Sequence, residues 1–236
     1  MAKQVTVYES DGTTLAQETY DEGSVEDGAA STPRRLWWKN TSTSSETLAD
    51  TRFRRVAVGA NDGLDSLQIA EDDPLAAPGQ PAGAAAAGSE LEVGLYKYAI
   101  TFVTANGETT AGTEREVTTT GGNERVQLSA IPTGPAGTTA RKVYRTLVDA
   151  SQKKLVDTIA DNVTTDYLDQ IPDGSLGANV PTLNTSGSPD TWQTANITIG
   201  TLAVGDFAPC WMRYSFASGL TEVGNARRAE VQFEET

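Results

Sequence analysis

The chain has 236 residues, of which 38% are hydrophobic, and it contains 22 Gly and 10 Pro. This length suits one large domain or two small ones, and the Gly and Pro content favours turns over long helices. The formal net charge of −14 argues against nucleic acid or an anionic membrane as a partner, because both carry negative charge themselves.

The chain has no His and a single Cys, Cys210. A thiol nucleophile with its base, a zinc site of Cys and His, and an intramolecular disulfide are therefore not expected. Cys210 lies in a strand-like run, where a buried small apolar side chain is the ordinary role. Neither a phosphate-binding Gly loop nor a nucleophile elbow occurs, so we expect no enzyme activity and no cofactor.

Residues 1–82 predict several short strands. Residues 5–8 alternate Val with Thr and Tyr, and similar runs follow at 33–40, 53–59 and 64–70. Trp37 and Trp38 are adjacent, so in a strand they point to opposite faces, and one can enter a core while the other meets a partner or a second layer. Arg54 follows Phe53, which suits either cation–π stacking or a strand edge facing water.

From residue 71 to residue 90 the composition shifts to Pro, Gly and Ala, which predicts a linker or a covering arm. The Ala run could form one helical turn, although Gly83 and Gly88 bracket it too tightly for a stable helix. The stretch NTSGSPDTWQ, residues 184–193, predicts a second polar hinge.

The clearest pattern lies between these hinges. Every second residue from 96 to 102 is large and apolar, which predicts a strand with one buried face. These residues are Tyr96, Tyr98, Ile100 and Phe102. Asn106-Gly107 then supplies hairpin turn residues. Further strands are expected at 115–119, 125–128, 141–147, 154–159 and 165–168, a spacing typical of a small antiparallel β-sandwich.

Residues 191–236 return to strands. Cys210 and Met212 share one face of the run 208–216, and Trp211 and Arg213 share the other. Three strands alone make a poor domain, and the opening segment has the same problem.

We therefore expect an all-β fold of two antiparallel β-sandwiches of the Ig/FN3-like kind, the second inserted into a loop of the first. Residues 1–82 plus 188–236 would form the outer sandwich, and residues 83–187 the inserted one. Three separate domains in a row remain the alternative, although the smallest would be marginally stable.

Residues 94–184 resemble a fibronectin type III/immunoglobulin-like module. The resemblance is carried by GLYKY and TFVTANGET, by IPTGPAGTTARKVYRT, and by LVDTIADNVTTDY. Such modules recur as spacers or display units in tail, fibre and other virion structural proteins of tailed bacteriophages, and they carry no catalytic residues. The resemblance implies a decoration or accessory subunit on head, neck or tail, bound to other virion proteins in repeated symmetric copies.

Interfaces favour Trp and Arg, so the predicted docking surface consists of Trp37, Trp38, Arg54, Trp211 and Arg213. The alternative function is a glycan-binding or adhesive β-sandwich module at a bacterial cell surface, in which these tryptophans or Trp192 would stack on sugars. The first ten residues lack the apolar stretch of a signal peptide, and no run approaches the roughly 20 apolar residues of a membrane span. We therefore expect a virion protein made in the host cytoplasm.

Oxygen-bearing side chains at turns leave calcium as a minor alternative, at Asn61, Asp62 and Asp65 or at Asp169 and Asp173. Asn and Asp at turns need no metal, so no metal site is predicted. The adjacent pair Asp72-Asp73 is interpreted as solvated linker, because a glycosidase needs two carboxyl groups held across a cleft.

Overall fold

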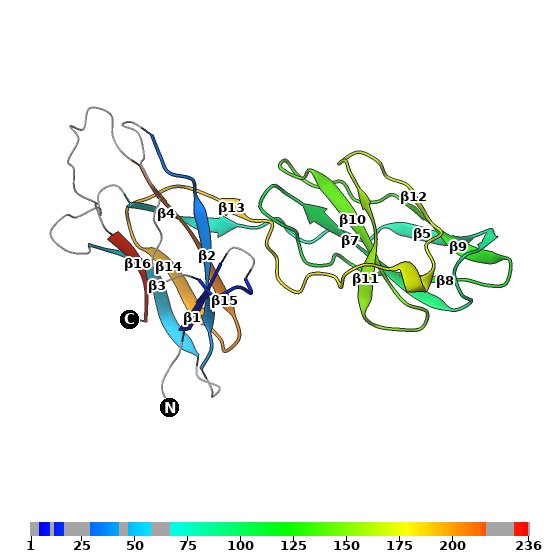
Figure 1. The fold of residues 1–236 in the computed structure, drawn as a ribbon, viewed down its shortest axis with the longest axis horizontal. Coiled ribbons are helices and arrows are strands. Elements are labelled where there is room, and N and C mark those ends of the chain that lie inside the picture. Colours follow the sequence, from blue (N-terminus) through cyan, green and yellow to red (C-terminus); the bar gives the residue numbers. More distant parts are fainter. Residues whose placement is uncertain are drawn as a thin grey trace. The chain divides into compact units, whose positions relative to one another are not determined.

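The structure, a computed structural model, describes residues 5–9, 12–16, 29–42, 47–57, 67–215 and 229–235. Apart from a short 3-10 turn, η1 (Asp173–Ser175), its regular elements are strands, so the all-β prediction is confirmed (Figure 1). Within these ranges, no helix has the length and apolar character needed to cross a bilayer. Contacts divide the chain into two compact units: unit 1 is Met1–Asp73 with Pro189–Thr236, and unit 2 is Pro74–Ser188.

Unit 1 combines strands from both ends of the chain. Its five-stranded sheet has the order β1-β2-β15-β4-β13, and its three-stranded sheet has the order β14-β3-β16. In the larger sheet Trp211 of β15 lies opposite Arg35 of β2 on one side and Ala70 of β4 on the other. The expected pairing between the two chain ends is therefore present. The strands are β1 (Val5–Tyr8), β2 (Arg34–Asn40), β3 (Leu48–Ala57), β4 (Leu67–Asp73), β13 (Ser188–Pro189), β14 (Ile197–Leu202), β15 (Phe207–Tyr214) and β16 (Ala229–Glu235).

The two sheets of unit 1 share one hydrophobic core. Trp38 of β2 lies in it, with its ring centroid 4.7 Å from that of Phe53 on β3. Trp37 is not part of this cluster, which confirms that the adjacent tryptophans point to opposite faces. Cys210 is 1% exposed in the same core, and burial raises the pKa of its thiol, as expected for a packing residue.

Unit 2 is built around β7 (Leu95–Val103). This strand lies in a four-stranded sheet of order β11-β10-β7-β8, and a second sheet has the order β12-β9-β5, with β6 also paired to β9. Tyr96, Tyr98 and Ile100 are fully buried between the sheets, as the alternation predicts. The remaining strands are β5 (Ala82–Ala86), β6 (Gly88–Ser89), β8 (Arg115–Thr118), β9 (Asn123–Ser129), β10 (Ala140–Thr146), β11 (Lys153–Ile159) and β12 (Tyr167–Asp169).

The predicted turn at Asn106-Gly107 follows β7. The backbone N–H of Thr104 donates to the carbonyl oxygen of Gly107 at 2.8 Å, and Val103 forms a β-bridge with Glu108. Gly107 has φ of 154°, and a Cβ there would collide with the carbonyl oxygen of Thr185. A glycine is therefore required at this position.

The linker or covering arm predicted at 71–90 is strand over half of its length. Residues 71–73 end β4, and the Ala run forms β5, which pairs antiparallel with β9 from Ala82 opposite Ser129 to Ala86 opposite Arg125. Ala and Gly have little preference for strands, so this strand depends on its neighbour rather than on its own sequence. The boundary expected at 82/83 lies inside β5, whereas contacts divide the chain at Asp73/Pro74.

The first and last segments of unit 2 are hydrogen-bonded to each other. The side-chain amide of Asn184 donates to the carbonyl oxygen of Leu75 at 2.8 Å, and the N–H of Leu75 donates to Ser186 Oγ at 3.0 Å. Along β11, the N–H of Leu155 donates to the carbonyl oxygen of Ala178 at 2.8 Å, so a following segment covers this sheet edge. Covered edges restrict strand pairing with other chains.

Candidate docking surface

The five-stranded sheet of unit 1 has a second face, opposite its core. On β2, Leu36 and Trp38 enter the core, so Arg35, Trp37 and Lys39 point to the other side. The same alternation on β15 places Phe207, Trp211 and Arg213 there. We name this surface the aromatic–cation face; it comprises Arg35, Trp37, Lys39, Trp192, Phe207, Trp211 and Arg213.

Cations and rings interleave across this face. Arg35 lies between two indoles, with its Cζ 5.1 Å from the ring centroids of both Trp37 and Trp211. At one end Lys39 Nζ lies 4.7 Å from the centroid of Phe207, and at the other Arg213 Cζ lies 4.2 Å from that of Trp192. Such contacts stabilise a cation over the negative face of a ring.

Asp72 of β4 neutralises the centre of the face. Its Oδ1 lies 3.4 Å from Arg35 Nη1 and accepts a hydrogen bond from Trp211 Nε1 at 2.5 Å, and the Arg35 and Asp72 side chains are each 1% exposed. Burial raises the pKa of Asp72 and lowers that of Arg35, because it disfavours both charged forms. The prediction of a solvated Asp72 is therefore wrong.

The five predicted docking residues do not converge. Trp37, Trp211 and Arg213 belong to the aromatic–cation face, but Trp37 is only 3% exposed and Trp211 only 7%. Trp38 lies in the core and is only 5% exposed. Arg54 alternates with the buried Phe53 on β3, so it points away from the core on the other sheet of unit 1.

Three members of this face, Arg35, Lys39 and Phe207, were not predicted as docking residues, and Trp192 was predicted only for the glycan-binding alternative. Phe207 shares the parity of Trp211, so extending that strand by one residue would have found it. Arg35 and Lys39 share the parity of Trp37. Trp192 carries no such signal, because it reaches the face only where Gln193 forms a β-bridge with Ile69 of β4.

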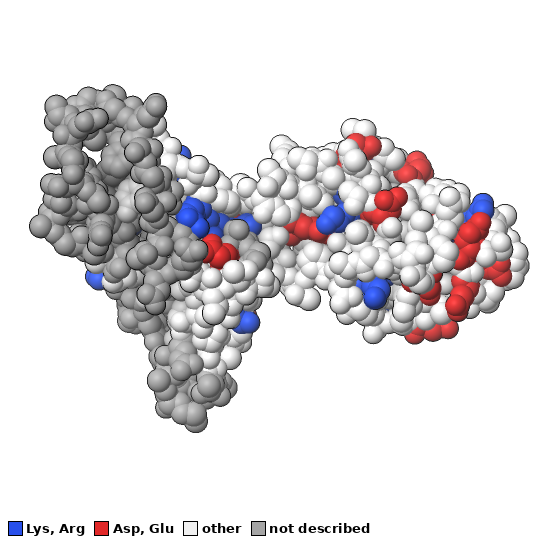
Figure 2. Space-filling model, viewed as in Figure 1, with Lys and Arg blue, Asp and Glu red and all other residues white. Residues whose placement is uncertain are grey.

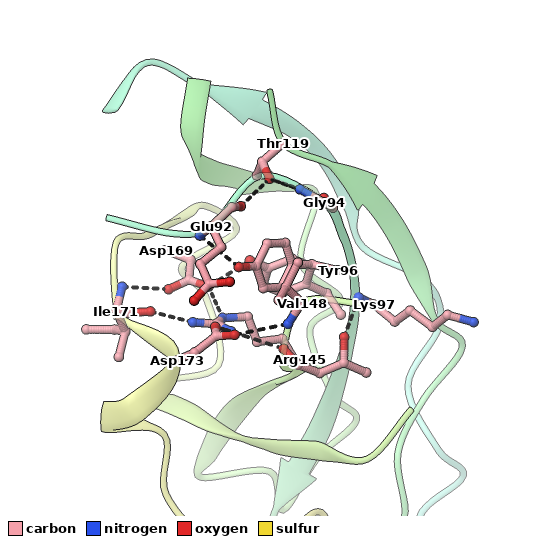
Figure 3. A network of polar contacts seen from close by, with 12 residues as sticks. Glu92, Gly94, Tyr96, Lys97, Thr119, Arg145, Val148, Asp169, Ile171 and Asp173 are labelled. Atoms are coloured by element: carbon pink, nitrogen blue, oxygen red, sulfur yellow. Dashed lines mark hydrogen bonds and ion pairs between the residues drawn. The ribbon is translucent and has the colours of Figure 1, made fainter. Parts of the chain in front are cut away.

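Unit 2 contains a buried polar network centred on Arg145, which is fully buried (Figure 3). Arg145 Nε donates to Asp169 Oδ2 at 2.7 Å, and its Nη1 forms an ion pair with Asp173. Tyr98 donates its hydroxyl to the same Asp169 oxygen at 2.7 Å, and the N–H of Val148 donates to Asp173 Oδ2 at 3.0 Å. The network joins β7, β10, β12 and η1.

This network bears on the calcium alternative. Asp169 and Asp173, which calcium would need, already bind the guanidinium of Arg145, and a second cation beside it would be repelled. In the part of the chain that the structure describes, no group of three acidic or Cys side chains is arranged to hold a metal. Asn61, Asp62 and Asp65 lie outside the described residues.

Comparison of the chain with protein-family models, with curated proteins and with solved structures finds no match. Of the surfaces described, the aromatic–cation face combines the most ring and cation contacts, which makes it the candidate docking surface.

Proposed function

We propose that the chain is a non-enzymatic structural protein of a tailed-phage virion, a decoration or accessory subunit on head, neck or tail. In this proposal unit 1 is an outer sandwich that docks onto other virion proteins, and unit 2 is an inserted Ig/FN3-like sandwich that is displayed. The phage assignment rests on the resemblance of residues 94–184, and the docking role rests on the aromatic–cation face of unit 1.

Several features of unit 2 suit a display module. It has its own core, its first and last segments are hydrogen-bonded to each other, and its buried charges are paired within the unit. Its polar network binds structural elements together, because every carboxylate in it accepts from Arg145 or from a backbone N–H. A module with these properties can serve as a spacer without contributing chemistry.

Immunogold labelling of purified phage particles with an antibody against unit 2 tests the proposal. We expect labels at regular positions on intact particles and none on particles that lack the gene. Mass spectrometry of the same particles should detect the chain at a constant stoichiometry. Absence of the chain from purified particles, or turnover of a substrate by the purified protein, would contradict the proposal.

The second candidate is a glycan-binding or adhesive module at a bacterial surface. One observation favours it: Trp37, Trp192 and Trp211 lie on one face, where tryptophans can stack on a sugar, although Trp37 and Trp211 are only 3% and 7% exposed. Trp192 is the most accessible of the three. Binding on a glycan array that disappears in Trp192→Ala would support this candidate, and an array without reproducible binding would exclude it.

A further inference from the structure

Two cations of the aromatic–cation face differ from most cations of unit 2. Unit 2 contains eight Lys and Arg residues, and six of them lie within 4.0 Å of a carboxylate oxygen. Within the described residues, neither Lys39 nor Arg213 forms an ion pair. Lys39 stacks on Phe207, and Arg213 stacks on Trp192.

This difference stands out in a chain with 32 acidic and 18 basic residues, where carboxylates are in excess. Asp72, a carboxylate on this face, is already bound by Arg35 and Trp211. Among the described residues that form this face, the partly exposed charges that remain are those of Lys39 and Arg213, and both are positive. Figure 2 shows the contrast in unit 2, where acidic side chains gather over the end that carries β8 and β9.

The stacking also orients Arg213. Its Nε donates to Gln68 Oε1 at 2.9 Å, and its guanidinium lies over the indole of Trp192. The hydrogen bond and the stacking contact together fix the orientation of the guanidinium. A guanidinium fixed in this way loses little conformational freedom when it binds a carboxylate, and its fork of donors matches the two carboxylate oxygens.

We propose that the aromatic–cation face binds an acidic surface of a partner protein, with Arg213 and Lys39 donating hydrogen bonds to its carboxylates. The proposal rests on the docking role suggested above and adds the chemistry of the partner. Complementary charge gives such a contact its specificity, and the flanking aromatic rings supply apolar area. A symmetric contact between two copies through this face would place like charges together, which disfavours a second copy as the occupant.

The test measures binding of a fluorescein-labelled poly-L-glutamate peptide to the intact chain by fluorescence anisotropy, with poly-L-glutamine of the same length as control. Near physiological ionic strength the Debye length is about 8 Å, so the distant carboxylates of the chain are screened. We expect poly-L-glutamate to bind, poly-L-glutamine not to bind, and binding to weaken as salt is added.

Variants locate the site. Arg213→Gln and Lys39→Gln should each weaken binding by about tenfold or more, the usual effect of losing a hydrogen bond to a charged group. Arg213→Lys should weaken it less, because the charge remains. Lys97→Gln, which removes a cation of unit 2 that is paired with Glu116, should leave binding unchanged. Circular dichroism of each variant confirms that it is folded.

Failure to bind poly-L-glutamate, or equal binding by all variants, would overturn the proposal. Sedimentation velocity tests whether a second copy of the chain occupies the face instead. Self-association that is abolished by Arg213→Gln but unaffected by poly-L-glutamate would assign the face to a second copy. The particle-labelling experiment remains independent of these results. A chain found in virions that does not bind poly-L-glutamate refutes the partner chemistry alone, whereas binding without incorporation into particles refutes the virion role.

Discussion

Arg145 is the residue on which the interior of unit 2 most depends, because its fully buried guanidinium balances two carboxylates. We predict that Arg145→Met destabilises the protein by about 3–5 kcal/mol, since removing one partner of a buried ion pair leaves the other charge uncompensated. Urea unfolding followed by circular dichroism measures the change. Lys154→Met is the matched control, because this cation of β11 forms no ion pair in unit 2, and it should change stability by no more than about 0.5 kcal/mol. Equal losses in both variants would refute the role assigned to Arg145.

Glu90 gives a prediction about pH. The hydrogen bond from Arg125, followed by that from the N–H of Ser89, lowers the pKa of Glu90 from 4.5 to about 2. A carboxyl group whose pKa is lower in the folded state stabilises the fold above its unfolded pKa, and this contribution is lost as pH falls through the folded pKa. Between pH 4.5 and about 2, therefore, Glu90 should progressively stop stabilising unit 2.

Carbon-detected NMR of the Glu90 carboxyl group measures this directly. We expect a titration midpoint near pH 2 in the native protein. In Arg125→Gln the midpoint should return toward the ordinary value for Glu, because the donor that contributes most is gone. A native midpoint at or above 4.5 would show that the Arg125 contact does not persist in solution.

At the residue scale, the sequence predicts which side chains of a strand share a face better than it predicts which of the two faces is buried. The alternation around Trp37 and Trp38 correctly assigns them to opposite faces, but both are Trp, so nothing local tells which one enters the core. Asp72 shows a second limit. Its partners Arg35 and Trp211 lie 37 and 139 residues away, and a carboxylate beside Pro-rich sequence gives no sign of such distant contacts.

At the element scale, β5 is unusual because a strand of Ala and Gly lies at the edge of a core. A Cβ on Gly83 would lie 3.0 Å from Leu128 Cδ2 and 3.2 Å from Val117 Cγ2, so there is little room for a side chain. We predict that Gly83→Val destabilises unit 2 by about 1–3 kcal/mol, the usual cost of overpacking. Ala84→Val, on the exposed side of the same strand, is the matched control and should be nearly neutral. Thermal unfolding of both variants measures the change in stability. An unchanged stability of Gly83→Val would mean that β5 does not pack as described.

The strands that the sequence predicts well are those whose own pattern is strong. β7 is expected from its alternating aromatic residues, and it is found at Leu95–Val103. β5 is missed because Ala and Gly carry no alternation, and its strand conformation comes from hydrogen bonding to β9. The network of Arg145 is also missed, because Asp169 and Asp173 stand at turn positions that suit a solvated loop equally well.

At the scale of the whole molecule, unit 2 has what an independent domain requires. We predict that Pro74–Ser188 expressed alone folds cooperatively, since this unit contains its own core and its first and last segments bind each other. A dispersed two-dimensional NMR spectrum and a single unfolding transition would support this. The control is the same fragment with Asn184→Ala, which should unfold at lower urea concentration because the tie to Leu75 is weakened. A collapsed spectrum for the unaltered fragment would show that unit 2 needs unit 1 to fold.

The hydrogen bonds of Leu75 with Asn184 and Ser186 have a consequence for how such a protein diversifies. A segment whose first and last residues lie close together can be exchanged by recombination for another segment, because the rest of the chain only has to accommodate the distance between those two ends. Replacing residues 74–188 with an unrelated β module of similar end-to-end spacing is therefore expected to leave unit 1 folded, while removing either terminal part of unit 1 is not.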